Sequence, residues 1–214
     1  MGSDEERHSH SIDPEVIADP VERTHRETRN GLLQAEQVLE WVENFTADGR
    51  PFRLRPSMIL SLHRTAMEGV KHLAGTWRTG AVEIVGSKHI PQAAYLVPGQ
   101  VEEMCDWIEE RWATATAVEL AAYAMWRMNW IHPFVDGNGR TARAVSYLVL
   151  CAKLGYRLPG LKTIPEHIAA NRNRTTKHWK RPTGEAWPSW RPTSVICSRA
   201  SFSTCTSLRL GQAH

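Results

Sequence analysis

Helical periodicity dominates the apolar positions of the chain, because apolar residues recur three and four positions apart in several long stretches. Proline at the first position favours a helix that starts at Pro56, and Gly155 is typical of a helix end. The pattern predicts helices over residues 24–45, 56–70, 101–112, 116–131 and 138–154, followed by a short helix over 164–172.

The predicted helices differ in how their apolar residues are placed. The helix over 101–112 carries one apolar stripe opposite several glutamates, so one of its faces should lie in water. The helix over 116–131 is apolar nearly all round, which places it at the centre of the fold. The expected stripes are Val101, Met104, Cys105, Ile108 and Trp112 in the former helix, and Met58, Leu62, Thr65 and Ala66 in the helix over 56–70.

The stretch between residues 75 and 99 breaks the helical pattern and predicts a small β-hairpin. Its runs AVEIV and KHIP flank Gly86 and Ser87, which is typical of a short turn led by glycine. Pro91 would keep the second strand at a sheet edge. The predicted fold class is therefore mainly α, with one small β-hairpin ahead of the last two long helices.

The length of 214 residues accommodates one domain with a sizeable core and extensions at both ends. We expect a partly disordered N-terminal extension over 1–23, a helical domain over 24–171, and an irregular or divergent tail over 172–214. The opening MGSDEERHSHSIDP lacks a cationic start followed by an apolar run, and no window of about 18 residues is apolar throughout. We therefore expect a cytoplasmic protein without a membrane span.

Positive charge is concentrated in the C-terminal part of the chain. The formal net charge is +3, but residues 171–214 hold eight Lys or Arg and one acid, whereas residues 1–170 hold 18 Lys or Arg and 22 acids. A nucleic-acid-binding domain should carry its basic patch on the folded surface. The mildly acidic body therefore argues against nucleic acid as a partner.

The cysteines and most histidines form no recognisable site. The four cysteines contain no Cys-x-x-Cys pair, so we expect reduced thiols. His63, His72 and His89 lack the spacing of metal ligands, and no Ser or Cys nucleophile motif stands out.

The run HPFVDGNGRTAR, residues 132–143, gathers chemically active residues between two helices that we expect to be buried. Gly137 and Gly139 let the backbone pass close to an anion, and the N–H groups of the turn add to the positive end of the helix dipole. Arg140 and Arg143 are three positions apart, so they project from one side of the helix and suit successive phosphates. The pattern predicts a phosphate site.

Two further residues of this run suit catalysis at a phosphate. Asp136 supplies one hard oxygen ligand for Mg²⁺ held mainly by substrate phosphates and water. His132 belongs to the residue type whose ordinary pKa is near neutrality, so it is a candidate general base. Each residue alone has a structural explanation, such as a helix cap or a turn residue, but their combination favours phosphoryl or nucleotidyl transfer.

The run resembles the motif of the Fic family (Fic/Doc domains), His-Pro-Phe-x-(Asp/Glu)-Gly-Asn-Gly-Arg-x-x-Arg, and every fixed position is filled. The resemblance extends more loosely over about residues 26–171, through LHR at 62–64, GTWR at 75–78 and the predicted hairpin. It implies a Fic-type helical domain with a hairpin called the flap, and a protein adenylyltransferase that uses ATP and Mg²⁺.

The resemblance implies a role for each position of the motif. His132 would deprotonate a Ser, Thr or Tyr hydroxyl of a target protein, which receives AMP while pyrophosphate leaves. Asp136 would hold Mg²⁺ on the α- and β-phosphates, and Pro133 and Phe134 would seat the loop in the core. The phosphate contacts would come from the amides of Gly137 and Gly139, from Asn138, and from Arg140 and Arg143 on the β- and γ-phosphates.

The resemblance also bears on the donor and the target. Gly139 matches the AMP-transferring members, because the phosphate-transferring Doc type carries lysine at this position. The flap implies that a target protein adds one of its segments as an extra strand, through main-chain pairing. The flap residues are Ile84, Val85, Gly86, Ser87, Lys88, His89 and Ile90.

One departure from the family pattern concerns inhibition. Many members carry an inhibitory helix with the run Ser/Thr-x-x-x-Glu-Gly/Asn, whose glutamate pairs with the second motif arginine. Here SIDPEV (11–16) lacks the final Gly or Asn, and RTAMEG (64–69) begins with arginine. Either the protein is unrestrained, or it is toxin-like and a separate antitoxin-like partner supplies the glutamate.

The second departure is the tail, which reads NRNRTTKHWKRP where the family usually continues with a helix that often bears a tyrosine near the adenine. Three interpretations stay open: a basic arm for an acidic partner, a divergent lid, or translation in a shifted frame. Protein adenylyltransfer is the main functional prediction. The alternatives are a non-catalytic Fic-fold interaction module and a Fic-type transferase with another phosphate-containing donor.

Overall fold

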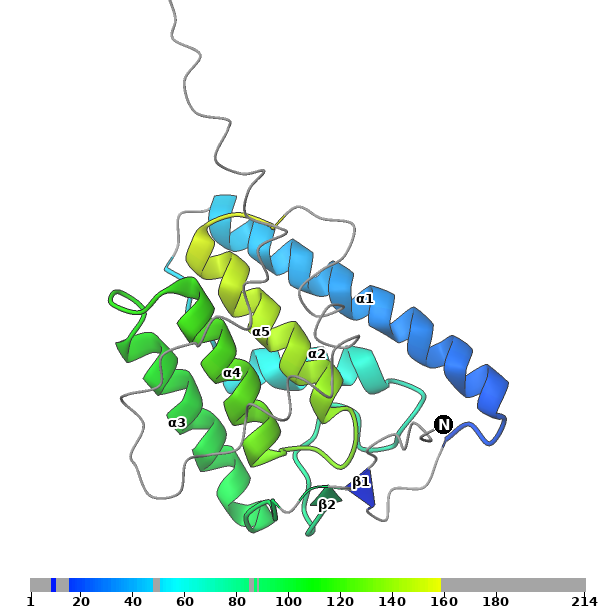
Figure 1. Ribbon diagram of the computed structural model, residues 1–214. Helices are drawn as coiled ribbons and strands as arrows, with labels where there is room; N and C mark the ends of the chain where they lie inside the picture. Colours follow the sequence, from blue (N-terminus) through cyan, green and yellow to red (C-terminus); the bar gives the residue numbers. More distant parts are fainter. Residues whose placement is uncertain (1–8, 11–15, 48–50, 85–86, 88, 159–214) are drawn as a thin grey trace, which may run out of the picture. The chain divides into compact units, whose positions relative to one another are not determined.

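Five α-helices make up most of the chain that the computed structural model describes, namely residues 9–10, 16–47, 51–84, 87 and 89–158 (Figure 1). Every described residue belongs to one compact unit, whose bounds are Met1–Trp179. The helices are α1 (Pro20–Ala47), α2 (Pro56–Met67), α3 (Val97–Glu110), α4 (Ala117–Ile131) and α5 (Asn138–Leu154), with a 3₁₀ turn η1 (Ala94–Leu96) before α3.

The mainly α fold class predicted from the periodicity is confirmed, and the five long helices lie where they were expected, with different ends. α1 begins at Pro20 rather than residue 24, and α3 begins at Val97 because Pro98 occupies its first turn. Gly155, with φ 76°, ends α5 as predicted. The expected short helix over 164–172 and the tail over 172–214 lie outside the described residues.

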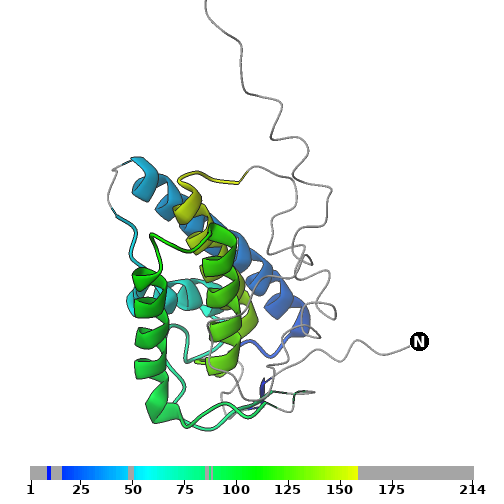
Figure 2. The ribbon, with the colours of Figure 1, turned by 60° about the vertical axis from the view of Figure 1, so that its left-hand side comes forward.

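The core lies between α4 and its neighbours. α4 packs against α3 on one side and α5 on the other, and α1 crosses α5 and α2 (Figures 1 and 2). Leu120, Ala124 and Met128 of α4 are fully buried, which agrees with the central place predicted for this helix. None of the helices in the described part of the chain is long and apolar enough to cross a membrane.

Buried amides of α1 fix the position of α2. Asn30 Nδ2 donates to the backbone oxygens of Ala66 at 3.3 Å and Glu68 at 2.8 Å, and Gln34 Nε2 donates to that of Leu62 at 2.9 Å. These donors satisfy carbonyls in the last part of α2, some of which have no partner within the helix. α2 packs against both α1 and α5 through its buried face. This face consists of Ile59, Leu62, His63, Ala66 and Met67.

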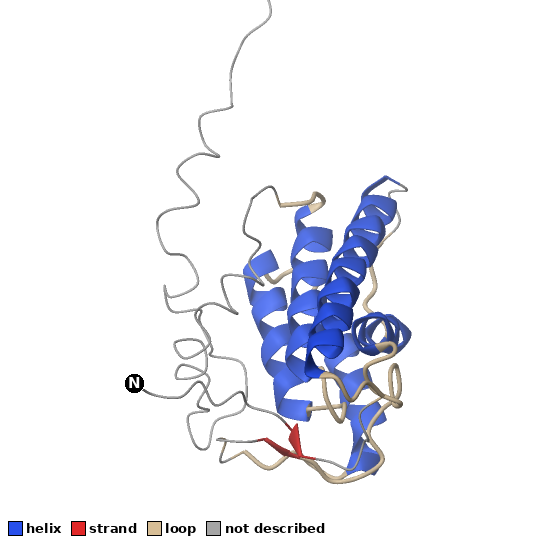
Figure 3. Cartoon of the chain, turned by 90° about the vertical axis from the view of Figure 1, so that its right-hand side faces the viewer, coloured by secondary structure: helices blue, strands red, loops and turns tan. Residues whose placement is uncertain are grey.

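The β-structure differs from the predicted hairpin. β2 (Glu83–Ile84) pairs antiparallel with β1 (Ser9–His10), with Ser9 opposite Ile84 (Figure 3). The predicted turn is present in part, since the Ser87 N–H donates to the Ile84 oxygen at 3.0 Å. The expected second strand is absent from the described residues 89–91.

The side chain of His89 explains why residues 89–91 do not pair with β2. Its ring stacks on Trp130 with centroids 3.7 Å apart, and its Nε2 atom lies 2.8 Å from the Trp130 carbonyl oxygen. These contacts attach this side of the flap to α4. Three predicted flap residues, Val85, Gly86 and Lys88, lie outside the described part.

Candidate functional site

The site lies in the turn between α4 and α5, where two residues adopt left-handed backbone conformations. His132 caps the C-terminus of α4 with φ 51° and ψ 60°, and Gly137 caps the N-terminus of α5 with φ 74°. His132 is the one residue other than glycine with a positive φ in the described part of the chain. A left-handed histidine costs roughly 1 kcal/mol, so its surroundings must hold this conformation.

Donors from distant parts of the chain occupy the backbone carbonyls around this turn. Arg78 Nε donates to the His132 oxygen at 2.8 Å, and the Arg78 N–H donates to the Pro133 oxygen at 2.9 Å. His63 Nε2 lies 3.0 Å from the Asp136 oxygen. Buried carbonyls require such partners, so the loop conformation is fixed from outside as well as by its own sequence.

Asn138 closes the loop upon itself. Its Oδ1 atom accepts from the Phe134 N–H at 2.9 Å, and its Nδ2 donates to the Phe134 oxygen at 2.8 Å. The side chain is buried and both of its polar groups are used in these bonds. In this conformation the phosphate contact predicted for Asn138 would have to be made by its backbone N–H group rather than by its side chain.

His63 supports the loop from α2, and the sequence interpretation did not assign it a role. Its ring lies parallel to that of Phe134, with centroids 3.6 Å apart and an interplanar angle of 4°. The Gly75 N–H donates to His63 Nδ1 at 2.9 Å, so the opposite nitrogen, Nε2, donates to Asp136. A histidine within a buried helical face, such as that of α2, is the available sequence signal for a polar contact of this kind.

The proposed base, His132, is buried and neutral. Only 9% of the residue is exposed, and burial lowers its pKa to about 4, with the Arg78 cation acting in the same direction. Nδ1 lies 3.4 Å from the Asn129 carbonyl oxygen, which can only accept. The proton of the neutral ring therefore lies on Nδ1, and Nε2 keeps its lone pair for an incoming proton.

The predicted phosphate site includes the backbone N–H groups of residues 137–139 at the first turn of α5, which are called the cradle below. The first turn contains no acidic residue and no side-chain cap, and the carboxylate that bonds to one of its amides, that of Gly137, belongs to Asp136 just before the helix. A Cβ atom on Gly139 would meet only the Arg143 guanidinium, at 3.4 Å. A Cβ atom on Gly137 would lie 2.7 Å from Met67 Sδ. The packing of the protein therefore excludes a side chain at position 137. At position 139 it does not, so the space beside Gly139 is open to a bound phosphate.

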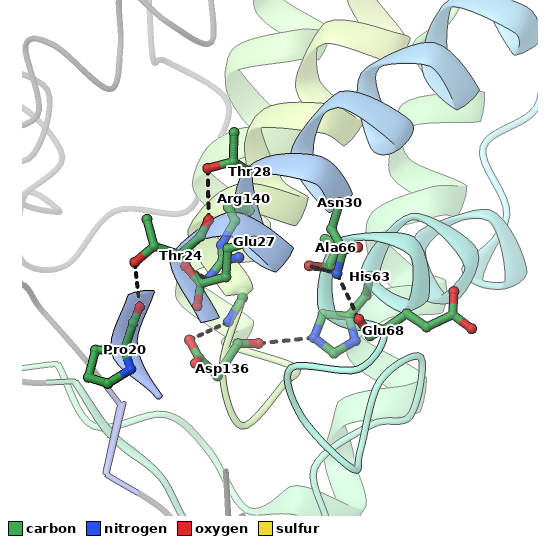
Figure 4. Close-up of polar contacts among 11 residues, drawn as sticks. Pro20, Thr24, Glu27, Thr28, Asn30, His63, Ala66, Glu68, Asp136 and Arg140 are labelled. Carbon is green, nitrogen blue, oxygen red and sulfur yellow. Dashed lines mark hydrogen bonds and ion pairs between the residues drawn. The ribbon is translucent and has the colours of Figure 1, made fainter. Parts of the chain in front are cut away.

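The charged residues of the motif lie around this turn. The Asp136 Oδ1 atom accepts from the Gly137 N–H at 2.6 Å, and the carboxylate is half-buried. Arg140 Nη2 lies 3.5 Å from Glu27 Oε2 of α1, which neither the motif nor the helical pattern predicts (Figure 4). An anion that binds Arg140 must therefore compete with Glu27.

A magnesium ion in this site would take few ligands from the protein. The described residues contain no group of three or more His, Cys, Asp or Glu side chains that could hold a metal. Asp136 alone fits Mg²⁺ only if phosphates and water supply the other ligands, which is the usual arrangement for this ion.

The described flap residues lie at the same end of the helices as the motif. Ile84 belongs to β2, His89 is attached to Trp130, two residues before His132, and Ile90 is 83% exposed. The structure thus brings the flap, the proposed base and the cradle together, while their binding roles stay predictions.

Known proteins resemble the part of the chain that carries this site. The family model described as "Fic/DOC family" matches residues 53–150. The "Protein adenylyltransferase Fic" of Nematostella vectensis is 29% identical over 122 residues, which are 56% of this chain and 28% of that protein. The "Protein adenylyltransferase fic-1" of Caenorhabditis briggsae is 36% identical over 94 residues, which are 43% of this chain and 18% of that protein.

A solved structure shows the same fold. The Fic domain containing signaling protein from Bacteroides thetaiotaomicron matches with a TM-score of 0.57 at 24% identity, covering 74% of this chain and 58% of that one. The matched segments span less than a third of the two curated relatives. These matches therefore concern the domain rather than the whole of those proteins.

We expect His63 to make the protein less stable in acid. Burial lowers the pKa of His63 to about 4 from 6.5, so the unfolded chain takes up this proton first as the pH falls below 6.5. The contribution of this pKa shift to the free energy of unfolding is present above pH 6.5 and is lost as the pH falls toward 4. From pH 7 to pH 5 the loss is about 2 kcal/mol per such histidine.

Urea denaturation of the wild type and of His63→Gln at the two pH values measures this loss. The substituted chain should lose less unfolding free energy than the wild type between pH 7 and pH 5, because one of the two buried histidines with a lowered pKa is then gone. An equal loss in the two proteins would show that His63 does not bear the shift.

Proposed function

The chain carries a domain of the Fic/DOC family over residues 53–150, and from this premise we propose that it is a protein adenylyltransferase. It would transfer AMP from ATP to the hydroxyl of a Ser, Thr or Tyr residue in a target protein. The names of the relatives from Nematostella vectensis and Caenorhabditis briggsae support this class of activity.

The observation that carries the proposal is the neutral His132 ring one short loop away from the N-terminus of α5. Nε2 keeps a lone pair that can accept the proton of an attacking hydroxyl. Arg78 and Asn129 hold the ring and its backbone without using that atom. The burial that lowers the pKa keeps this base unprotonated at neutral pH.

The cradle suits the phosphates of ATP. The backbone N–H groups of Gly137, Asn138 and Gly139 lie at the positive end of the α5 dipole. Arg140 and Arg143 follow three positions apart, and their guanidinium groups match phosphate oxygens in geometry and charge. Asp136 would hold Mg²⁺, which neutralises phosphate charge when bound.

The chemistry proceeds as one displacement at the α-phosphorus of ATP. The target hydroxyl oxygen forms a bond to this phosphorus, and the bond to the oxygen that bridges the α- and β-phosphates breaks. The hydroxyl proton passes to Nε2 of His132, and pyrophosphate leaves with the bridging oxygen. Arg140 and Arg143 stabilise the charge on the leaving group.

A target segment would dock on the flap as a strand. β2 already pairs with a strand of the same chain, which indicates that its edge accepts a partner through main-chain bonds. The cytoplasmic location, an antitoxin-like partner and the choice of nucleobase stay predictions. A phosphate or UMP donor and a non-catalytic module remain the alternatives that the following experiments exclude or support.

We expect the His132→Ala variant to lose label transfer. With α-³²P-ATP and Mg²⁺, in buffer and in a cell lysate, the wild type should label protein, whereas removal of the base should lower the rate roughly 10²- to 10⁴-fold. His72→Ala, at an exposed histidine of the same domain, is the control and should label at the wild-type rate.

Persistence of label in the His132→Ala protein would contradict the assigned base. A wild type that transfers no label and whose melting temperature is unchanged by MgATP would exclude the enzyme and favour the interaction module. Transfer from γ-labelled ATP or from α-labelled UTP would identify another donor.

Alanine substitutions at the two glycines of the cradle should have different effects, one on the stability of the protein and the other on its affinity for nucleotide. Gly137→Ala should lower stability by roughly 1–3 kcal/mol, because its φ of 74° is strained for alanine and its Cβ meets Met67. Gly139→Ala should keep the wild-type melting temperature and bind MgATP about tenfold more weakly, because the methyl group enters the cradle. Calorimetric titration with MgATP decides this, and unchanged affinity in Gly139→Ala would place the phosphates elsewhere.

Glu27→Gln should tighten MgATP binding, because it frees Arg140 from its half-exposed ion pair. Exposed pairs of this kind contribute about 0.2–1 kcal/mol, so we expect affinity to rise by a factor of about 1.4 to 5. Glu22→Gln removes an equal charge from the first turn of α1 and is the matched control. Equal effects of the two substitutions would show that only the net charge of α1 matters.

A further inference from the structure

Arg78 is a charged residue whose side chain is buried beneath the loop segments on either side of the flap. The residue is 2% exposed, and no carboxylate pairs with it among the residues that the structure describes. A buried charge is costly unless its donors are satisfied. The group must therefore be held by what surrounds it, and the carbonyls at the negative end of the α4 dipole supply this environment.

The acceptors of the guanidinium group fall into two sets. Nη1 donates to the Gly80 oxygen at 3.0 Å and Nη2 to the Gln92 oxygen at 2.6 Å. Nε donates to the His132 oxygen at 2.8 Å, and Nη2 also lies 3.5 Å from the Ile131 oxygen. The second set is the C-terminus of α4, where the proposed base sits.

The first set of acceptors, the backbone oxygens of Gly80 and Gln92, comes from the two chain segments that lead into the flap. Gly80 and Gln92 lie on either side of residues 84–90, so both chain segments that lead into the flap end on the same planar group. The β-strands lie at the end of the molecule where α4 ends and α5 begins (Figures 1 and 3). His89 adds a second attachment through its ring on Trp130 and its bond to the Trp130 oxygen.

A guanidinium group suits this task better than an ammonium group. Its donors lie in one rigid plane and point in fixed directions, whereas a lysine Nζ is a single point with rotating donors. Only the planar group can bond to Gly80, Gln92 and His132 at the same time and keep their mutual distances fixed.

We propose that Arg78 is a positioning residue that sets the distance between the target-binding flap and His132. The inference rests on the proposed function, because the flap is taken to hold the acceptor hydroxyl. The hydrogen bonds of the Arg78 guanidinium group end on the flap segments and on the end of α4, and its backbone N–H bonds to the Pro133 oxygen ahead of the cradle. Its loss should impair the use of the acceptor and leave MgATP binding intact.

The experiment compares wild type with Arg78→Lys and Arg78→Gln, and uses Arg53→Lys, the same change at an exposed ion-paired arginine, as the control. MgATP affinity is measured by calorimetric titration. The rate of label transfer is measured as a function of the concentration of the acceptor that the wild type labels. We expect affinities within about twofold of wild type and a loss of about tenfold or more in kcat/KM for the acceptor in both Arg78 variants.

Nuclear magnetic resonance makes the test independent of activity. The backbone amide signals of Ser87, His89 and His132 should move in the folded Arg78→Lys protein, and those of Gly137 and Gly139 should stay in place. If the wild type transfers no label but these shifts appear, the proposed function fails and the positioning role stands. Unmoved flap and His132 signals, an equal loss of MgATP affinity, or loss of folding in both variants would each overturn the proposal.

Discussion

The conformation of the α4–α5 turn depends on the satisfaction of its backbone carbonyls. The end of an α-helix leaves carbonyls without partners, and here His132 turns into the left-handed region as α4 ends. Donors come from α2, from the loop after it, from the flap and from α5. Because these donors are His63, Arg78, His89 and Asn138, the turn is a point at which five segments of the chain are fixed to one another.

Two buried histidines near this turn have a lowered pKa and are therefore neutral at pH 7. His63 and His132 are both buried, and burial lowers the pKa of each to about 4. His63 uses both ring nitrogens and supports Phe134, whereas His132 has one nitrogen committed to the backbone. Burial therefore keeps both rings neutral, so that His63 supports Phe134 and the loop, and His132 is a candidate base.

Local signals predicted the fold class and the order of the motif, but not the tertiary contacts. The twelve-residue run predicted a turn into a helix with Gly137 and Gly139 at its start, and the structure places them there. The buried face of α2 is rotated from the expected stripe: Ile59 and Met67 are buried, whereas Met58 and Thr65 are only partly so. That rotation carries His63 inward.

The hairpin prediction failed for a related reason. The local pattern predicted that residues 88–91 pair with the strand before the turn. Instead, the side chain of His89 contacts the ring and the carbonyl oxygen of Trp130, 41 positions away. The actual partner, Ser9–His10, shows no strand periodicity that a reading of the sequence could detect. Contacts such as Glu27 with Arg140 likewise join residues that no local pattern connects.

The pairing of β1 with β2 has a consequence for any strand that docks on the same edge. Ser9–His10 belongs to the same molecule, so it competes with such a strand as a tethered ligand. Its ladder is only two residues long, which makes it weak in itself. A segment that docks on this edge therefore has to form more main-chain bonds than the two-residue ladder that it displaces.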